Sequence, residues 1–75
     1  MDTRGARHLK ARLAVGAAVG ERVEVVAVEP GTGAPVRPGD EGRVVAFDEE
    51  LVRVRLGSGA EHDIDPTQVR LRRVA

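Results

Sequence analysis

Apolar and polar residues alternate with a period of two from Gly20 to the end of the chain. This alternation is typical of strands with one buried face. It breaks off at four places, so it predicts five short strands over residues 22–28, 42–47, 51–56, 60–64 and 69–73. Valine dominates the apolar positions, and its branched Cβ favours strands. The pattern therefore predicts an all-β fold from residue 20 onward.

The four interruptions predict the connections between these strands. Residues 29–39 hold three prolines and three glycines, which break regular structure, so we expect a long loop there. Residues 48–50 and 57–59 predict tight turns. Residues 65–68 predict one 3₁₀ turn, with Asp65 as its cap and Pro66 at its first position. Strands joined in this way predict a small five-stranded barrel, because closing the sheet removes most free edges.

A three-residue turn at 57–59 sets the register of the hairpin around it. This register puts apolar pairs on one face and pairs of opposite charge on the other. The pairs are Leu56 with Ala60, Val54 with His62, Val52 with Ile64, Arg55 with Glu61, and Arg53 with Asp63.

The hairpin before it allows two registers. A three-residue turn pairs Val44 with Val54 but sets Arg43 against Arg55, which is unfavourable. A two-residue turn places Phe47, the only aromatic residue, on the core face. We favour the second register, and a β-bulge would reconcile the two.

Residues 1–19 lack the alternation. Ala6, Leu9, Leu13 and Ala17 form a narrow apolar stripe at helical spacing, whereas the glycines of this segment oppose a stable helix. Two alternatives remain: a short helix docked on the barrel, or a disordered arm. We therefore divide the chain into a basic N-terminal helix or arm, residues 1–19, and a β-barrel, residues 20–75.

Composition restricts the setting of this fold. The chain has 75 residues and no cysteine, so it forms one small domain without a disulfide or a thiolate metal site. No apolar run approaches the ~20 residues that span a membrane, and residues 13–19 are too weakly hydrophobic for a signal peptide. We expect a cytoplasmic protein without membrane contact.

Charge is unevenly distributed although the formal net charge is zero. Residues 1–20 and 66–75 are each basic, whereas residues 21–65 hold five arginines against eleven acids. The basic residues of the two ends could form one patch if the arm lies near the last strand, and arginine binds phosphate or carboxylate groups in a bidentate manner. This predicted patch comprises Arg4, Arg7, Lys10, Arg12, Arg70, Arg72 and Arg73.

Two stretches carry a family resemblance, residues 19–25 and residues 38–44. They resemble the opening of bacterial SH3-like domains, and Gly39, Gly42 and Val44 match the Gly-x-x-Gly-x-Val element of KOW domains. The resemblance covers residues 19–73 and implies a five-stranded SH3-like barrel. It implies little about function, because this scaffold hosts many activities.

The chain departs from the binding families that use this scaffold. KOW domains that bind RNA usually carry basic residues around the glycine motif, where this chain has Asp40 and Glu41. Without Trp or Tyr it lacks the aromatic groove of peptide-binding SH3 domains and the aromatic cage for methylated lysine. It also lacks exposed aromatic residues that would stack on bases.

Three segments contain residues that could bind ligands, and each has a simpler explanation. Residues 61–65 hold three acids and His62, but strand alternation puts His62 on the opposite face from the acids. Residues 48–50 supply too few ligands for Ca²⁺. Residues 31–33 lack the strand and helix that flank a phosphate-binding loop. We therefore expect no metal, no cofactor and no catalytic residues.

The long first loop is the more plausible place for partner contact, through Thr32, Val36 and Arg37. We expect a non-enzymatic binding or adaptor module for a protein partner. The alternative is a KOW-like nucleic-acid-binding accessory protein in transcription or translation that uses the basic termini. A second copy of the chain is a further candidate partner.

Overall fold

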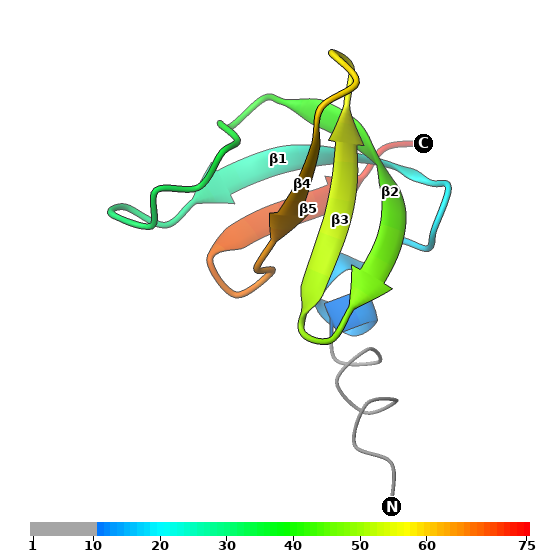
Figure 1. The fold of residues 1–75 in the computed structure, drawn as a ribbon, viewed down its shortest axis with the longest axis horizontal. Helices are drawn as coiled ribbons and strands as arrows, with labels where there is room; N and C mark the ends of the chain where they lie inside the picture. Colours follow the sequence, from blue (N-terminus) through cyan, green and yellow to red (C-terminus); the bar gives the residue numbers. More distant parts are fainter. Residues whose placement is uncertain (1–10) are drawn as a thin grey trace, which may run out of the picture.

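The computed structural model of the protein describes residues 11–75, in which five antiparallel strands form one curved sheet (Figure 1). The strand order across the sheet is β4-β3-β2-β1-β5. Each strand predicted from the alternation is present, with its ends within one residue of the prediction. The strands are β1 (Arg22–Val28), β2 (Glu41–Asp48), β3 (Leu51–Leu56), β4 (Glu61–Ile64) and β5 (Val69–Arg73).

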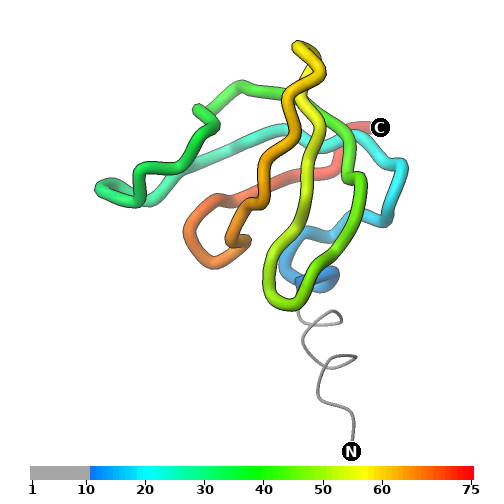
Figure 2. Tube along the Cα trace, viewed as in Figure 1, coloured from blue at the N-terminus to red at the C-terminus, as the bar shows by residue number. Residues whose placement is uncertain are grey.

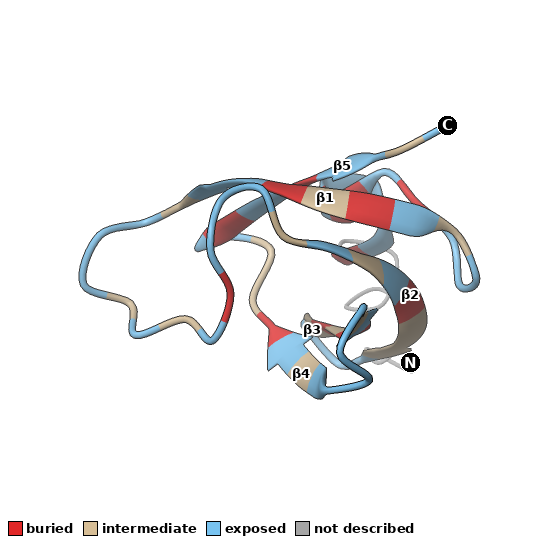
Figure 3. Ribbon diagram, turned by 90° about the horizontal axis from the view of Figure 1, so that it is seen from above, coloured by how far each residue is buried: buried red, intermediate tan, exposed pale blue. Residues whose placement is uncertain are grey.

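The inner face of the sheet carries the core, and Figure 3 marks the buried positions along the strands. Inward and outward residues alternate along the strands except at two register shifts, one in β1 and one in β2, and most of the inward residues are valines. Phe47 is only partly buried and packs at the margin of the core, so aliphatic side chains form its centre. The strand residues in the core are Val23, Val25, Val44, Val52, Val54, Ile64, Val69 and Leu71.

The β3–β4 hairpin has the predicted register. Val52 lies opposite Ile64 on the inner face, while the arginines of β3 meet acids of β4 on the outer face. Arg53 Nε donates to an Asp63 carboxylate oxygen at 2.9 Å. This hydrogen bond and the charge of Asp63 raise the pKa of Arg53 above its ordinary value.

The β2–β3 hairpin contains the bulge that reconciles the two predicted registers. Near the turn, Phe47 lies opposite Val52, as a two-residue turn requires. Farther along, Arg43 lies opposite Arg55, as in the three-residue alternative. The register shifts at Val45, which is the extra residue of the bulge.

The predicted closure of the sheet into a barrel is wrong for the described residues. The edge strands are β4 and β5, and neither pairs with the other. The physical reason is length: the free edge of β4 spans only four residues, which leaves little backbone for a second pairing. The chain then crosses in one turn to β5, which pairs with β1 on the other side of the sheet.

The crossing turn is held by its aspartate, as predicted. Asp65 accepts hydrogen bonds from the Thr67 amide at 2.9 Å and from the Thr67 hydroxyl at 2.7 Å. These bonds to the ionised form lower the pKa of Asp65. The Gln68 amide donates to the Asp65 carbonyl at 3.0 Å, which is the i+3 to i bond of the single 3₁₀ turn predicted.

The N-terminal segment packs into the same core as the strands. Residues 11–15 are helical, and Gly16, with a positive φ of 70°, ends the helix. Ala11, Val15 and Ala17 are buried, whereas Leu13 is 75% exposed. The predicted stripe is therefore wrong at Leu13 and right at Ala17, while its other two residues lie outside the described range. Short apolar segments fit several helical stripes, and packing selects among them.

The long first loop, residues 29–40, projects away from the sheet (Figure 2). It is anchored at its C-terminal end, where Val36 is 3% exposed and belongs to the core. Backbone bonds fix the return of the chain: the Gly39 amide donates to the Val25 carbonyl, and the Val25 amide donates to the Asp40 carbonyl, both at 2.8 Å. The loop is thus tied to β1 at one end and exposed at its tip.

Candidate functional site

An apolar surface lies where the N-terminal segment meets the end of β2. Leu13 is 75% exposed and Val19 is 59% exposed, and only one other large hydrophobic residue in the described range, Val26, is comparably exposed. Val19 lines a hollow of about 370 Å³ together with Arg12 and Phe47. We call Leu13, Ala18, Val19 and Phe47 the N-terminal apolar surface.

Ion pairs within the sheet neutralise part of the predicted basic patch. Arg72 pairs with Glu24, and Arg73 lies 3.4 Å from a Glu21 carboxylate oxygen. Both acids come from the neighbourhood of β1, beside which β5 lies. The carboxylates therefore offset two of the charges that the sequence assigned to the patch.

Two arginines of the predicted patch stay without a partner among residues 11–75. The side chains of Arg12 and Arg70 make no hydrogen bond or ion pair with other residues in that range, although Arg70 lines the same groove as Ala14. The N-terminal segment thus approaches β5, as the patch requires. The remaining members, Arg4, Arg7 and Lys10, lie outside the described residues.

The predicted loop residues have different environments. The Thr32 hydroxyl accepts a hydrogen bond from the Ala34 amide at 3.2 Å, and the Arg37 side chain is exposed. Val36 is buried, so a partner could not touch its side chain while the loop keeps this conformation. Loop contact therefore rests on Thr32 and Arg37. Val36 is the only large apolar residue among the prolines and glycines of the loop, and this was the sequence signal for its burial.

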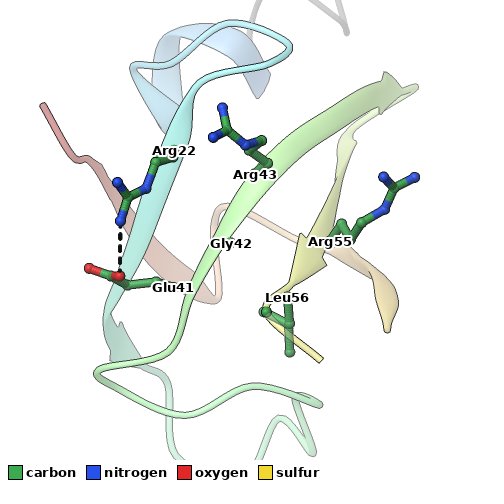
Figure 4. Close-up of a pocket in the computed structure, with 7 residues that line it drawn as sticks. Arg22, Glu41, Gly42, Arg43, Arg55 and Leu56 are labelled. Carbon is green, nitrogen blue, oxygen red and sulfur yellow. Dashed lines mark hydrogen bonds and ion pairs between the residues drawn. The ribbon is translucent and has the colours of Figure 1, made fainter. Parts of the chain in front are cut away.

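A row of three arginines crosses the outer face of the sheet, and sequence reasoning did not assemble it. Arg22 of β1 lies opposite Arg43 of β2, and Arg43 lies opposite Arg55 of β3 (Figure 4). We call these three residues the arginine row. The sequence contained half of the signal, since one register of the β2–β3 hairpin already set Arg43 against Arg55. The partner on β1 depends on where the long loop returns the chain, which no local pattern fixes.

Each arginine of the row has a different partner. Arg55 donates from Nε and Nη2 to one Glu61 carboxylate oxygen, at 2.8 and 2.6 Å. Arg22 reaches a Glu41 oxygen only at 3.4 Å. The central Arg43 has no carboxylate partner among the described residues, and its Nη1 donates to the Gly20 carbonyl at 2.8 Å.

The row borders a shallow hollow of about 330 Å³ whose lining includes Gly42. A Cβ at Gly42 would lie 2.5 Å from the Arg55 carbonyl oxygen and 2.7 Å from Val54 Cγ1. Gly42 therefore allows β2 and β3 to approach closely at this point. Gly39, two residues before β2, needs glycine for another reason, its positive φ of 98°. Both glycines of the KOW-like element thus have structural roles.

The acidic segment of β4 has the arrangement expected from strand alternation. Glu61 and Asp63 are occupied by arginines of β3, and half-buried His62 lies opposite Val54. Within residues 11–75, no three His, Cys, Asp or Glu side chains gather as metal ligands would. The same range contains no helix with the length and hydrophobicity needed to cross a bilayer.

Comparison with known proteins gives no relative. No family model, no curated protein and no solved structure matches the chain.

Proposed function

We propose that the protein is a small non-enzymatic module that binds a protein partner through the N-terminal apolar surface. The observation that carries this proposal is the exposure of Leu13 and Val19, two large hydrophobic side chains of one segment that line neighbouring hollows with Arg12 and Ala18 in common. A single exposed hydrophobic residue is ordinary, whereas a cluster beside a hollow is typical of contact sites. The module would act in the cytoplasm. Its own fold would be SH3-like, and the number of strands and the lengths of the connections support this fold.

Charge specifies the partner further. Arg12 borders the same hollow as Val19 and pairs with no acid in the described range. A partner segment with apolar anchors beside an Asp or Glu would bury Leu13 and Val19 and pair with Arg12. We therefore propose an acidic, apolar peptide segment of another protein as the occupant.

The nucleic-acid alternative has less support. Arg72 and Arg73 are paired with acids, and residues 21–65 carry a net negative charge. Phosphate backbones are bound by unneutralised cations, so this pairing weakens the predicted patch. A labelled oligonucleotide tests this alternative beside the peptides.

Selection from a random-peptide display library tests the proposal. Wild-type protein should enrich peptides with apolar residues next to Asp or Glu. The double variant Leu13→Ser, Val19→Ser should bind the enriched peptides at least about tenfold more weakly, as expected when buried apolar anchors are lost. Both side chains are exposed, so the fold should survive the change.

Val26→Ser is the matched control, because Val26 is exposed but lies on β1. It should leave the affinity unchanged. The proposal is overturned if no peptide is enriched, or if the double variant binds as well as the wild type. It is also overturned if a labelled oligonucleotide binds more tightly than any peptide, with an affinity that falls steeply with salt.

A further inference from the structure

Like charges face each other across two strand pairs in the arginine row. Residues directly opposite in an antiparallel pair have Cβ atoms about 5 Å apart, and like charges there are destabilising. Arg43 has such a neighbour on each side, Arg22 on β1 and Arg55 on β3. Places where a sequence breaks a folding rule are often functional sites.

The central arginine has most of its hydrogen-bonding capacity unused. A guanidinium carries five N–H donors, and among the described residues Arg43 makes one hydrogen bond, to the Gly20 carbonyl. Its side chain is exposed on the outer face next to the hollow (Figure 4). The remaining donors can therefore reach a ligand without any change in the fold.

The flanking arginines can contribute as well. Arg22 holds Glu41 at 3.4 Å, with about half of each side chain exposed. Exposed ion pairs of this kind are weak and exchange easily. Arg55 is engaged more firmly, by two bonds to Glu61. We therefore expect Arg43 to be the main contact, Arg22 the second and Arg55 a source of positive field.

Acids beside the row set a limit on the affinity. Glu41 lines the hollow, and Glu24 lies opposite Glu41 in the next row of the sheet. Glu24 is paired with Arg72, so Glu41 is the acid that an incoming anion would meet. Binding should therefore be weak, and it should strengthen when Glu41 loses its charge.

From this arrangement we propose that the arginine row binds a phosphate-type oxyanion, with the Arg43 guanidinium as the principal ligand. A tetrahedral oxyanion presents several acceptor oxygens, which suits the forked donors of neighbouring arginines. Its negative charge would also relieve the repulsion within the row. This site is separate from the N-terminal apolar surface, so the two proposals can fail independently.

Titration of ¹⁵N-labelled protein with inorganic phosphate tests the proposal, with sodium chloride keeping the ionic strength constant. Saturable shifts are expected at the amides of Gly42, Arg43 and Leu56 and at the Arg43 side-chain Nε–H. Arg43→Gln should weaken binding by about tenfold, the loss expected for charged hydrogen bonds. Glu41→Gln should strengthen it.

Arg53→Gln is the matched control. It removes the same charge from the same face of the sheet, but Arg53 pairs with Asp63 and does not line the hollow. Its affinity for phosphate should equal that of the wild type. Shifts that do not saturate would show diffuse charge screening and overturn the proposal. Equal weakening of phosphate binding by Arg43→Gln and Arg53→Gln would do the same.

A second titration identifies the source of the oxyanion. A short peptide with one phosphoserine is compared with inorganic phosphate on the same protein. Tighter binding of the peptide, lost in Arg43→Gln, assigns the site to a phosphorylated chain. Equal binding assigns it to free phosphate, and absence of binding by both ligands refutes the site.

Discussion

Replacing Gly42 by alanine tests the close approach of β2 and β3. The added Cβ would lie 2.5 Å from the Arg55 carbonyl oxygen, whereas ordinary contacts begin near 3.4 Å. The strands must therefore separate by about 0.9 Å, the difference between these distances, because backbone cannot rotate away as a flexible side chain does. Overpacking of this kind costs about 1–3 kcal/mol.

The opposing gain from alanine is smaller. Gly→Ala lowers the entropy of the unfolded chain and stabilises by about 0.4–1 kcal/mol where the backbone permits it. Gly42→Ala should therefore lose about 1–2 kcal/mol in net terms, which is a Tm decrease of roughly 4–16 °C for a domain of this size. A chain of this length has a stability of about 4–11 kcal/mol, so the variant should still fold at 25 °C.

Gly57→Ala is the control, since its Cβ would meet nothing within 4 Å and its φ is not positive. It should raise the Tm by a few degrees. Thermal unfolding followed by far-ultraviolet circular dichroism measures both variants, and the absence of Trp and Tyr leaves that signal to the backbone. If Gly42→Ala is as stable as Gly57→Ala, the packing described at Gly42 is wrong.

Three further changes test other parts of the fold. Thr67→Ala removes the hydroxyl hydrogen bond to Asp65 and keeps the one from the backbone amide, so an NMR titration should show the Asp65 pKa rising part of the way toward its ordinary value. Because the pKa of Asp65 is lowered in the folded state, the stability that its hydrogen bonds contribute is present above about pH 4 and is lost as the pH falls through the folded-state pKa. The free energy of unfolding of the variant should therefore differ less from that of the wild type at pH 2 than at pH 7. Glu49→Gly should be about 1 kcal/mol more stable than Glu50→Gly in urea unfolding, since only Glu49 has a positive φ, of 55°. Val36→Ala should destabilise by about 1–3 kcal/mol and speed hydrogen exchange at Gly39, whereas unchanged stability would contradict the anchoring of the loop.

The strands were predictable because each depends on local alternation. Val52 and Val54 in β3 lie on one face whatever the rest of the chain does, and the charged partners in β4 then fix the hairpin. Closure of the sheet was not predictable in this way. It depends on whether β4 can reach β5, which is a property of strand length and curvature across the whole sheet.

The candidate surfaces were harder to predict for the same reason. Leu13 was expected to be buried, because four apolar residues at helical spacing define a stripe on an isolated helix. Val15 belongs to the core instead, and Ala11 is buried as well. Pairing of Arg72 with Glu24 likewise depends on β5 lying beside β1, a neighbour 48 residues away in sequence. Local charge counts cannot reveal such a partner.

The bulge at Val45 links the core to the arginine row. In an unbulged strand leading from the two-residue turn, Arg43 would lie opposite Leu56, whose position belongs to the core face. A charged residue there would be costly, so the bulge moves Arg43 to the outer face, where it meets Arg55. The demands of turn and core thus place some polar residue at position 43, but they do not require arginine.

The identity of residue 43 is therefore open to a direct test. Arg43→Thr removes both like-charge contacts and introduces a good strand former, so it should raise the Tm by a few degrees in low salt. The gain should shrink as added salt screens the wild-type repulsion. A less stable variant would show that the bond to the Gly20 carbonyl outweighs the repulsion, and arginine would then be explained by folding. If the variant is more stable than the wild type, folding does not explain the arginine at this position. A surface residue that lowers the stability of the protein is typical of a residue retained for binding.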